Sequence, residues 1–431
     1  MPINELAVFA HVDGVFVPSG LLMLTEDQNR TVASSFIYGA RYLERPNRIE
    51  IDPTSLPLGD NPVAMTPVNG LPLFGGIRDA APDGWGRRVI EARLKAPPNS
   101  LAESVYLLEA GGDRTGALDV RLSINALANS RQKTSMVRLE YLLEAADRIE
   151  QGLPIPSGLE DIFEAGAGTG GMRPKATVED ANGIVWLAKF PCRGEHLNIP
   201  SIETGTMRLA NAAGLNVPPV KTEMIGKRNV MLIRRFDREL IDGVQRRHHV
   251  VSALTILGCH ESESINKSYW NIADSIKKLT PISQVKHDQK ELFGRMVFNI
   301  LVSNDDDHLR NHSFIWDGTL KGWKLSPLYD VVPRPSLSFE RNLHLGVGDK
   351  GRLATVNNAL SGYSRFGLTL HDAHEEIDRI WATVREWKTH FEEYGVEDSE
   401  IDRIAPAFRH IDDIFDRKVS VSLSRKSLAD T

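Results

Sequence analysis

The part of this chain that most constrains its fold is residues 291–330, where four patterns follow one another in order. Residues 291–304, ELFGRMVFNILVSN, place apolar side chains at helical spacing and predict a buried helix. The acidic loop NDDDHLRNHSF comes next, and Asp317-Gly318 then marks a turn between two strand-like stretches that end at Asp330. This order predicts that a core helix delivers an acidic loop and that a hairpin delivers one more carboxylate.

The acidic loop has a spacing that suits phosphoryl transfer. Asp306 and Asn311 are separated by four residues, like the catalytic Asp and the metal-binding Asn of the protein-kinase pattern H-R-D-x-x-x-x-N. A carboxylate beside a hydroxyl nucleophile orients it and accepts its proton, and magnesium prefers hard oxygen ligands, a role that suits Asp330. The alternative is a solvated acidic turn, because consecutive Asp residues and a lone D-x4-N also arise by chance. The flanking helix and hairpin favour the catalytic interpretation.

Length and composition narrow the class of protein. A chain of 431 residues predicts two or three domains, and 41% hydrophobic with 25% charged residues is ordinary for a soluble protein. It has no apolar run of 18 residues and no secretory signal at its start, so no membrane span is expected. Its two cysteines, Cys192 and Cys259, give no disulfide framework and favour a cytoplasmic location. A net charge of −6 argues against strong nucleic-acid binding by the whole chain.

The distribution of patterns predicts three regions. Residues 1–130 read as a mixed α/β accessory domain, residues 131–240 as a strand-rich small lobe, and residues 241–431 as a helical large lobe. Asp13-Gly14 and Asn182-Gly183 each predict a hairpin turn. We therefore expect an α+β fold of the two-lobe protein-kinase-like type, with a β-rich small lobe, an all-α large lobe and the accessory domain in front.

The strand-rich region contains candidates for nucleotide binding. A glycine-rich stretch at residues 164–178 precedes a strand, and glycine lets backbone amides approach phosphate, although the Walker pattern is absent and a merely flexible loop is the alternative. Lys189 ends an apolar strand and needs an anionic partner, such as phosphates or Glu203. A strand-end lysine that reaches solvent and a first-turn helix acid are the competing interpretations.

The segment NVMLIRRFDR resembles a strand that leads into an adenine-binding hinge, in which the backbone from Arg234 to Phe236 would pair with the base. A plain core strand is the alternative. The basic residues here (Arg234-Arg235 with Arg238) and those at residues 246–249 are expected to form solvated or phosphate-facing patches.

Motifs along nearly the whole chain occur in a recognisable order. They are DAAPDGWGRRVIEARL, LLEAGGDRTGAL, GGMRPKA, LAKFP, ETGTMRLANAAGLNVP, LIRRFDR, NDDDHLRNHSF and LSPLYDVVP. Each is modest alone, but together they resemble the HipA family, the serine/threonine kinase toxins of bacterial toxin–antitoxin pairs.

The resemblance implies a site that uses ATP and Mg²⁺. Asp306 would be the catalytic base, and His308 would either contact the γ-phosphate or brace the loop. Asn311 and Asp330 would hold magnesium. Nucleotide contacts would come from Gly170, Gly171, Met172, Arg173, Pro174, Lys175, Lys189, Glu203, Arg234, Arg235, Phe236, His308, Leu309, Arg310 and Tyr329.

One departure from the family concerns its control. The best-known members carry a loop serine whose autophosphorylation ejects the glycine-rich loop, but Gly168 stands at that position here, followed by Thr169. Two hypotheses follow: Thr169 is the autophosphorylation site, or control rests on the antitoxin. The hinge also has Arg234 where the family often has Glu, a change that backbone contacts tolerate.

The resemblance implies a protein serine/threonine kinase toxin that a helix-turn-helix antitoxin of the HipB type holds inactive. The antitoxin would also bind operator DNA. The substrate would be a translation component such as an aminoacyl-tRNA synthetase, and the outcome growth arrest and persistence. Two alternatives stay open: a small-molecule kinase of the aminoglycoside-phosphotransferase type, and a catalytically silent co-repressor. The accessory domain disfavours a small-molecule kinase. A catalytically silent co-repressor is disfavoured because all four residues expected in a kinase site are present: Lys189, Asp306, Asn311 and Asp330.

Overall fold

The computed structural model describes residues 5–127 and 134–416, and these form two compact units that the chain enters more than once. The first unit contains the described residues up to Glu195, Lys221–Cys259 and Phe314–Lys321. The second contains His196–Val220, His260–Ser313 and the described residues from Gly322 onward. The sequence boundary predicted at residue 130 lies outside the described residues.

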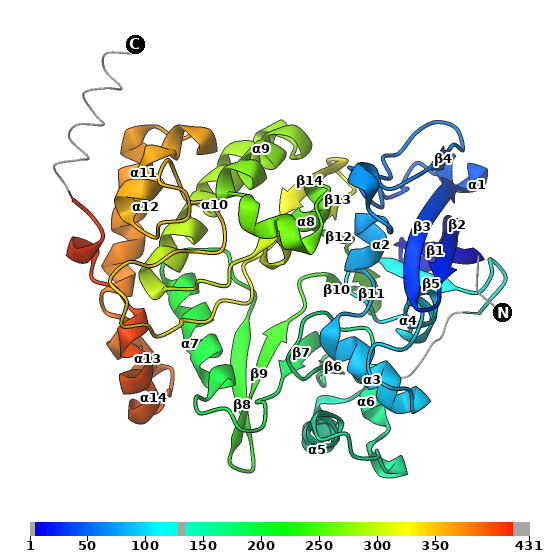
Figure 1. Cartoon of the computed structure of the whole chain (residues 1–431), viewed down its shortest axis with the longest axis horizontal. Coiled ribbons are helices and arrows are strands. Elements are labelled where there is room, and N and C mark those ends of the chain that lie inside the picture. Colours follow the sequence, from blue (N-terminus) through cyan, green and yellow to red (C-terminus); the bar gives the residue numbers. More distant parts are fainter. Residues whose placement is uncertain (1–4, 128–133, 417–431) are drawn as a thin grey trace. The chain divides into compact units, whose positions relative to one another are not determined.

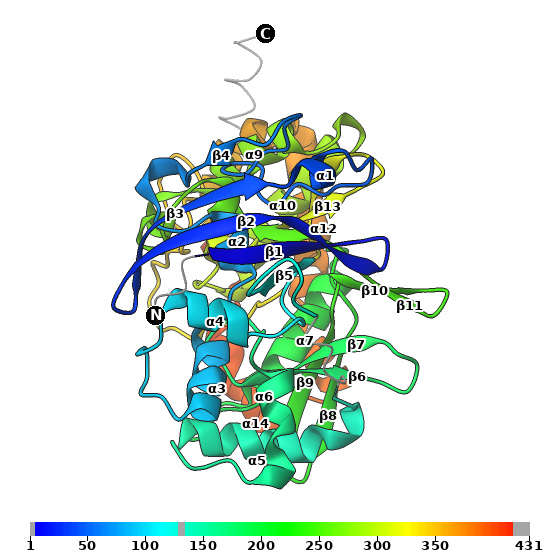
Figure 2. The same cartoon turned by 90° about the vertical axis from the view of Figure 1, so that its right-hand side faces the viewer.

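A five-stranded antiparallel sheet begins the first unit, with the order β4-β3-β2-β1-β5. Its strands are β1 (Glu5–Val12), β2 (Val15–Asp27), β3 (Arg30–Tyr38), β4 (Ala64–Met65) and β5 (Leu118–Arg121). The long strands β1, β2 and β3 run side by side in Figure 2. Asp13 (φ 48°) and Gly14 (φ 89°) form the β1–β2 turn, as predicted, because Asp-Gly tolerates the two positive φ angles that a tight hairpin needs.

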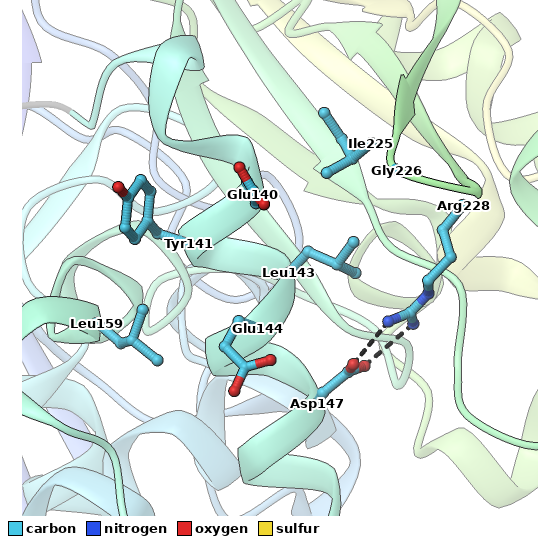
Figure 3. Close-up of a pocket in the computed structure, with 9 residues that line it drawn as sticks. All are labelled: Glu140, Tyr141, Leu143, Glu144, Asp147, Leu159, Ile225, Gly226 and Arg228. Atoms are coloured by element: carbon cyan, nitrogen blue, oxygen red, sulfur yellow. Dashed lines mark hydrogen bonds and ion pairs between the residues drawn. The ribbon is translucent and has the colours of Figure 1, made fainter.

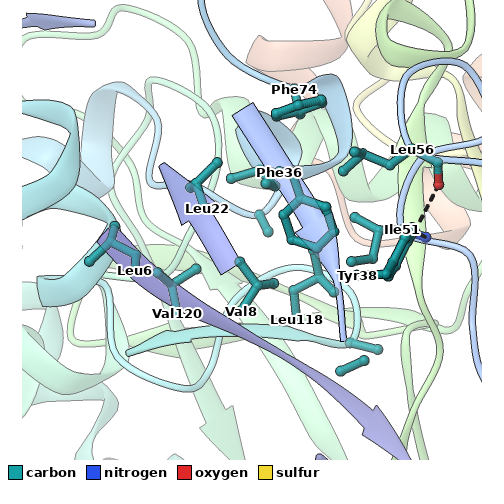
Figure 4. Packing of buried hydrophobic residues seen from close by; sticks show 14 of the residues in the cluster. Leu6, Val8, Leu22, Phe36, Tyr38, Ile51, Leu56, Phe74, Leu118 and Val120 are labelled. Carbon is teal, nitrogen blue, oxygen red and sulfur yellow. Dashed lines mark hydrogen bonds between the residues drawn. The ribbon is translucent and has the colours of Figure 1, made fainter. Parts of the chain in front are cut away.

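The sheet buries one hydrophobic core of the first unit (Figure 4). Leu6 and Val8 of β1, Leu22 of β2 and Phe36 of β3 are almost completely buried there. The Tyr38 hydroxyl, in the same core, donates to Leu56 O (2.7 Å) and accepts from Ile51 N (3.2 Å), so this buried polar group is satisfied. These contacts tie the loop after β3 to the sheet.

A second antiparallel sheet of the first unit carries the segments predicted to bind nucleotide, with the order β6-β7-β9-β8. Its strands are β6 (Lys175–Glu179), β7 (Val185–Lys189), β8 (Val220–Ile225) and β9 (Arg228–Arg234). Gly183 (φ 76°) lies in the β6–β7 turn that Asn182-Gly183 predicted. A hairpin of β10 (Arg238–Ile241) and β11 (Val244–Arg247) follows β9.

The helices of the first unit are short, apart from α3 and α5. They are α1 (Ala40–Leu43), α2 (Gly75–Asp79), α3 (Gly84–Leu94), α4 (Glu103–Glu109), α5 (Leu139–Glu150), α6 (Asp161–Ala165) and α8 (Ala253–Ile256). Three further short strands of the described residues are β12 (Val250–Ser252), β13 (Ser313–Asp317) and β14 (Gly322–Leu325).

Helices dominate the second unit. They are α7 (Ile199–Ala212), α9 (Tyr269–Leu279), α10 (Ile282–Val302), α11 (Val356–Ser361), α12 (Leu370–Val384), α13 (Trp387–Glu393) and α14 (Asp398–Ile404). The central α10 packs against α9 and α12 (Figure 1). Its C-terminal half, from Leu292 to Val302, is buried on all sides, which explains why most of its side chains are apolar. No helix in the described part of the chain is both long and apolar enough to cross a membrane.

Candidate functional site

The acidic loop begins where α10 ends, at Ser303, whose left-handed conformation (φ 52°) turns the chain out of the helix. Asp307, the last of the three aspartates, points inward and is completely buried. Its Oδ2 accepts from Asn299 Nδ2 (2.8 Å), His312 Nε2 (2.8 Å) and the Tyr269 hydroxyl. Burial opposes ionisation, but these partners hold the pKa of the Asp307 carboxyl below its ordinary value. Asp307 therefore anchors the loop.

Asp306 and Asp305 point the other way, and their side chains are 54% and 52% exposed. Arg334 pairs with both: its Nη2 donates to Asp306 Oδ2 (2.6 Å), and its Nε lies 3.1 Å from Asp305 Oδ1. Asn311 lies beside Asp306, because its Nδ2 donates to the Asp306 carbonyl (3.1 Å). The structure thus brings together the residues predicted as base and metal ligand, with the base carboxylate accessible to a substrate.

The segment that carries Asp330 is tied to the same loop through its neighbour Tyr329. The Tyr329 hydroxyl donates to Arg310 O (2.6 Å) and lies 2.5 Å from Ser313 Oγ. Asp330 itself is half-buried and adopts a left-handed conformation (φ 61°), which is uncommon for a residue with a side chain. The Tyr329 hydroxyl is used to position this segment, and a nucleotide contact by Tyr329 stays a prediction.

Residues 308–310 brace the loop from its other side. Leu309 is buried, its N–H donates to Ser264 Oγ (3.2 Å), and the Arg310 guanidinium pairs with Glu261 (2.5 Å). The His308 ring meets the His344 ring edge-on at 5.9 Å. Burial, and then the charge of His308, lower the pKa of His344. These contacts fit the bracing role considered for His308, and its contact with phosphate stays a prediction.

The glycine-rich loop of the first unit leads into β6. Gly171 has φ +82°, and the space beside Gly170 Cα is open. Lys175 Nζ donates to Gly170 O (2.6 Å), and Arg173 forms an ion pair with Glu195. Pro174 O accepts from Phe190 N (2.9 Å), and Met172 is exposed. The loop is thus an ordered turn with one open face.

Two lysines concentrate positive charge beside this loop. Lys175 and Lys189 are directly opposite each other across β6 and β7, and both are buried. Directly opposed residues of an antiparallel pair project on the same face of the sheet. The positive charge of these two side chains is opposite in sign to that of a polyphosphate. In the second unit, Glu203 is buried in the second turn of α7, so it is neither a first-turn acid nor a solvated one.

In the segment LIRRFDR, the side chains of Arg235, Asp237 and Arg238 are bound within the first unit itself. The Arg235 N–H donates to Val185 O (3.0 Å), and the Arg235 guanidinium donates to both oxygens of Asp237 (2.9 and 2.7 Å). Arg238 donates to Asp237 (2.8 Å) and to Asp113 (2.9 Å). Despite burial, the arginines hold the pKa values of Asp113 and Asp237 below their ordinary range. The solvated or phosphate-facing patch expected around Arg235 and Arg238 is therefore wrong, while backbone contacts of residues 234–236 with adenine stay a prediction.

Among the described residues, no three His, Cys, Asp or Glu side chains are grouped as a metal site. A magnesium site of the kinase type does not need such a group. In phosphoryl transfer, the ligands of magnesium are one carboxylate, one amide oxygen and the phosphate oxygens of the nucleotide. Asp330 and Asn311 provide the right kinds of oxygen donor.

A cavity of about 470 Å³ lies elsewhere in the first unit, along α5 and the β8–β9 turn (Figure 3). Arg228 and Asp147 close one side of it with a two-bond ion pair (2.6 and 3.0 Å). None of its nine lining residues belongs to the predicted site.

Two models of known protein families match the sequence of this chain. A family model described as the HipA-like C-terminal domain matches residues 167–388, and one described as the HipA N-terminal domain matches residues 18–121. This chain belongs to the HipA family.

Relatives of this HipA-family chain are named as kinases. It is 26% identical to the putative kinase Y4mE of Sinorhizobium fredii over 345 residues, 75% of this chain and 77% of that protein. It is 29% identical to the serine/threonine-protein kinase toxin HipA of Shewanella oneidensis over 160 residues, 34% of this chain and 36% of that protein.

A solved structure shows the same fold. A chain from the Shewanella oneidensis complex of HipA, HipB and operator DNA matches with a TM-score of 0.65 and 19% identity, covering 93% of this chain and 94% of that one. The predicted α+β kinase-like fold is thus confirmed.

The sequence did not single out Asp307 and Arg334. Asp307 differs from its neighbouring aspartates in that the fold buries it, where His312 binds it. Arg334 lies four residues after Asp330, and only the folded chain brings it to Asp306.

Proposed function

We propose that this chain is an ATP- and magnesium-dependent protein serine/threonine kinase that acts as the toxin of a toxin–antitoxin pair. The observation that carries the proposal is the acidic loop, in which an accessible Asp306 is placed beside Asn311 while Asp307 anchors the turn. Membership of the HipA family and the names of the relatives support the reaction class.

In the proposed reaction, Asp306 orients the substrate hydroxyl and accepts its proton as the hydroxyl oxygen attacks the γ-phosphorus of ATP. The new O–P bond forms while the bond to the β-γ bridging oxygen breaks, and ADP leaves with that oxygen. Magnesium, held by Asn311, Asp330 and phosphate oxygens, would neutralise charge on the phosphates. Lys175, Lys189 and the glycine-rich loop would bind the phosphates, with Glu203 as a candidate partner of Lys189 and the backbone of residues 234–236 beside adenine.

The partners of the proposed toxin follow from the same relatives. The structural relative comes from a complex with HipB and operator DNA, which supports a HipB-like helix-turn-helix antitoxin as partner and DNA contact mainly through it. We propose a translation component such as an aminoacyl-tRNA synthetase as substrate, and growth arrest as the outcome. Both come from the family resemblance.

Control by the glycine-rich loop takes a different form from that of the best-known members. A Cβ at Gly168 would lie 2.6 Å from Asp113 O, so a serine does not fit there without a backbone shift. Thr169 is buried, and its hydroxyl donates to Gly166 O (2.7 Å), so phosphorylation of Thr169 would require the loop to open. These contacts favour control by the antitoxin. A gain of one phosphate in the intact mass after incubation with ATP, lost in Thr169→Val, would restore the Thr169 hypothesis.

The deciding experiment measures transfer of labelled γ-phosphate from magnesium-ATP to the proteins of a cell extract. Asp306→Asn should lower transfer by about a hundredfold or more. Asp305→Asn is a matched control, because Asp305 is equally exposed and also pairs with Arg334. It should retain most of the activity.

Each outcome has a defined meaning. A labelled protein band with wild type and Asp305→Asn, but not with Asp306→Asn, supports the protein kinase and its base. Equal labelling by Asp306→Asn contradicts the site. Absence of protein labelling with nucleotide still bound contradicts the protein kinase and favours a small-molecule kinase or a silent co-repressor.

A further inference from the structure

The stretch PDGWG, residues 82–86, lies at the start of α3 and holds the glycine-rich loop by three hydrogen bonds. Trp85 N donates to Gly171 O (2.9 Å), and Gly171 N donates to Asp83 Oδ2 (3.2 Å). The Trp85 indole Nε1 donates to Lys175 O (2.8 Å). Trp85 is completely buried. Both backbone groups of Gly171, at the centre of the predicted phosphate loop, are therefore bound by residues that lie about ninety positions earlier in the chain.

The start of α3 approaches the loop so closely that it needs glycine. A Cβ at Gly86 would lie 2.6 Å from Ala167 O and 2.8 Å from Thr169 O. These distances are too short for any side chain, so α3 contacts the loop backbone directly. The glycine in this motif is thus explained by its packing against the loop.

A second segment of the N-terminal region, GGDRTG at residues 111–116, touches the loop and the LIRRFDR segment together. The Asp113 carbonyl faces Gly168, and the Asp113 carboxylate accepts from Arg238 (2.9 Å) and Arg235 (3.3 Å). Gly116 N donates to Asp237 Oδ2 (2.7 Å). One short segment therefore fixes two of the elements predicted to bind nucleotide.

We propose that Trp85 and Asp83 are positioning residues for nucleotide binding, and that the N-terminal region is a working part of the nucleotide site. A glycine-rich loop loses much conformational freedom when it closes on phosphates. Contacts that fix the loop beforehand reduce that loss and strengthen binding. Trp85 and Asp83 would act through Gly171 and Lys175, to which they are hydrogen-bonded. The inference rests on the proposed function, since it assumes that this loop binds ATP.

The test compares two conservative substitutions in the same buried cluster. Trp85→Phe removes the indole N–H that binds Lys175 O and keeps most of the apolar volume. Tyr106→Phe is the matched control: Tyr106 belongs to the same cluster and donates to Glu91 Oε1 (2.5 Å), so the change also deletes one side-chain hydrogen bond, away from the loop. Measurements are the Kd of a fluorescent ATP analogue with magnesium, KM for ATP, kcat and Tm.

We expect Trp85→Phe to raise Kd and KM for ATP roughly five- to tenfold, the effect of one lost hydrogen bond, with kcat changed less than about threefold. Hydrogen exchange at the Gly171 amide should accelerate. Tyr106→Phe should lower Tm to a similar degree but leave Kd and KM within about twofold. Equal Kd values for wild type and Trp85→Phe, or an equal loss in Tyr106→Phe, would overturn the inference.

A second variant covers the case in which Trp85→Phe does not fold. Asp83→Ser keeps an N-cap residue for α3 but is too short to accept from Gly171 N, so it should raise Kd in the same way. If the wild-type chain does not bind magnesium-ATP at all, the proposed function fails. If it binds and transfers phosphate while Trp85→Phe and Asp83→Ser match it, only this inference fails.

Discussion

Two charged segments, the acidic loop after α10 and the arginine segment after β9, look equally polar in sequence but use their charge differently. In the acidic loop, Asp305 and Asp306 are half exposed, and Arg334, itself half exposed, contacts both of them. In the arginine segment, Arg235, Asp237 and Arg238 are almost completely enclosed and satisfy one another. Charge that stays accessible can act on a substrate, whereas enclosed and fully paired charge holds the fold together.

The same contrast exists within the acidic loop itself. Asp306 and Asp307 are adjacent in sequence, yet one side chain is 54% exposed and the other is 1% exposed. The exposed carboxylate is the candidate base, and the buried one fixes Tyr269, Asn299 and His312. Substitutions of Asp306 and Asp307 can therefore test whether the first has a chemical role and the second a structural one.

The largest effect is expected on stability from Asp307→Ala. The change leaves three buried donors without their acceptor, so the free energy of unfolding should fall by about 3–5 kcal/mol. Asp306→Ala removes one exposed ion pair and should change it by no more than about 1 kcal/mol. Chemical denaturation of both variants measures the difference. Similar values for the two would break the distinction between an anchoring and an accessible aspartate.

The pH dependence of stability tests the buried segment around His249. His249 Nε2 donates to Ile51 O (2.8 Å), and burial lowers the pKa of His249 to about 4. An unfolded histidine has a pKa near 6.5, so between about pH 6.5 and 4 the unfolded chain takes up a proton that the folded chain refuses. The free energy of unfolding should therefore decrease as pH falls through this window, by up to about 3 kcal/mol from this group.

The matched control for His249 is its neighbour His248, which is partly exposed and pairs with Glu239 (3.0 Å). His249→Gln keeps an amide donor near the Nε2 position and should flatten the decrease between pH 6.5 and 4. His248→Gln should leave that decrease nearly unchanged. An unaltered pH profile in His249→Gln would show that another group causes the loss.

The smallest effect is expected from Arg334→Gln in the acidic loop. Arg334 is 53% exposed, so its ion pairs with Asp305 and Asp306 should contribute no more than about 1 kcal/mol and weaken as salt is added. Thermal melts at low and high salt measure this contribution. A loss of several kcal/mol that salt does not reduce would mean that this side of the loop is also structural.

Local sequence signals predicted much of the secondary structure, because turns and helix periodicity depend on residues that are neighbours in the chain. Asp13-Gly14 and Asn182-Gly183 each gave the predicted hairpin turn. The helix predicted at 291–304 is longer, α10 (Ile282–Val302), since its first half is polar and lacks the apolar repeat. The β10–β11 hairpin was missed although Asp242 (φ 49°) and Gly243 (φ 74°) carry the same turn signal.

By itself, the sequence determined the kinds of residue and their spacing: the glycine-rich stretch, the lysine that ends an apolar strand, and the Asp-x4-Asn loop. Only the tertiary structure decided which of these charges are accessible and which are enclosed. It buried Asp307, Arg235 and Arg238, left Asp306 in contact with solvent, and brought Trp85 to the glycine-rich loop. The reason is physical, because burial and partners depend on residues far apart in the chain, whereas turns and helix periodicity depend on neighbours.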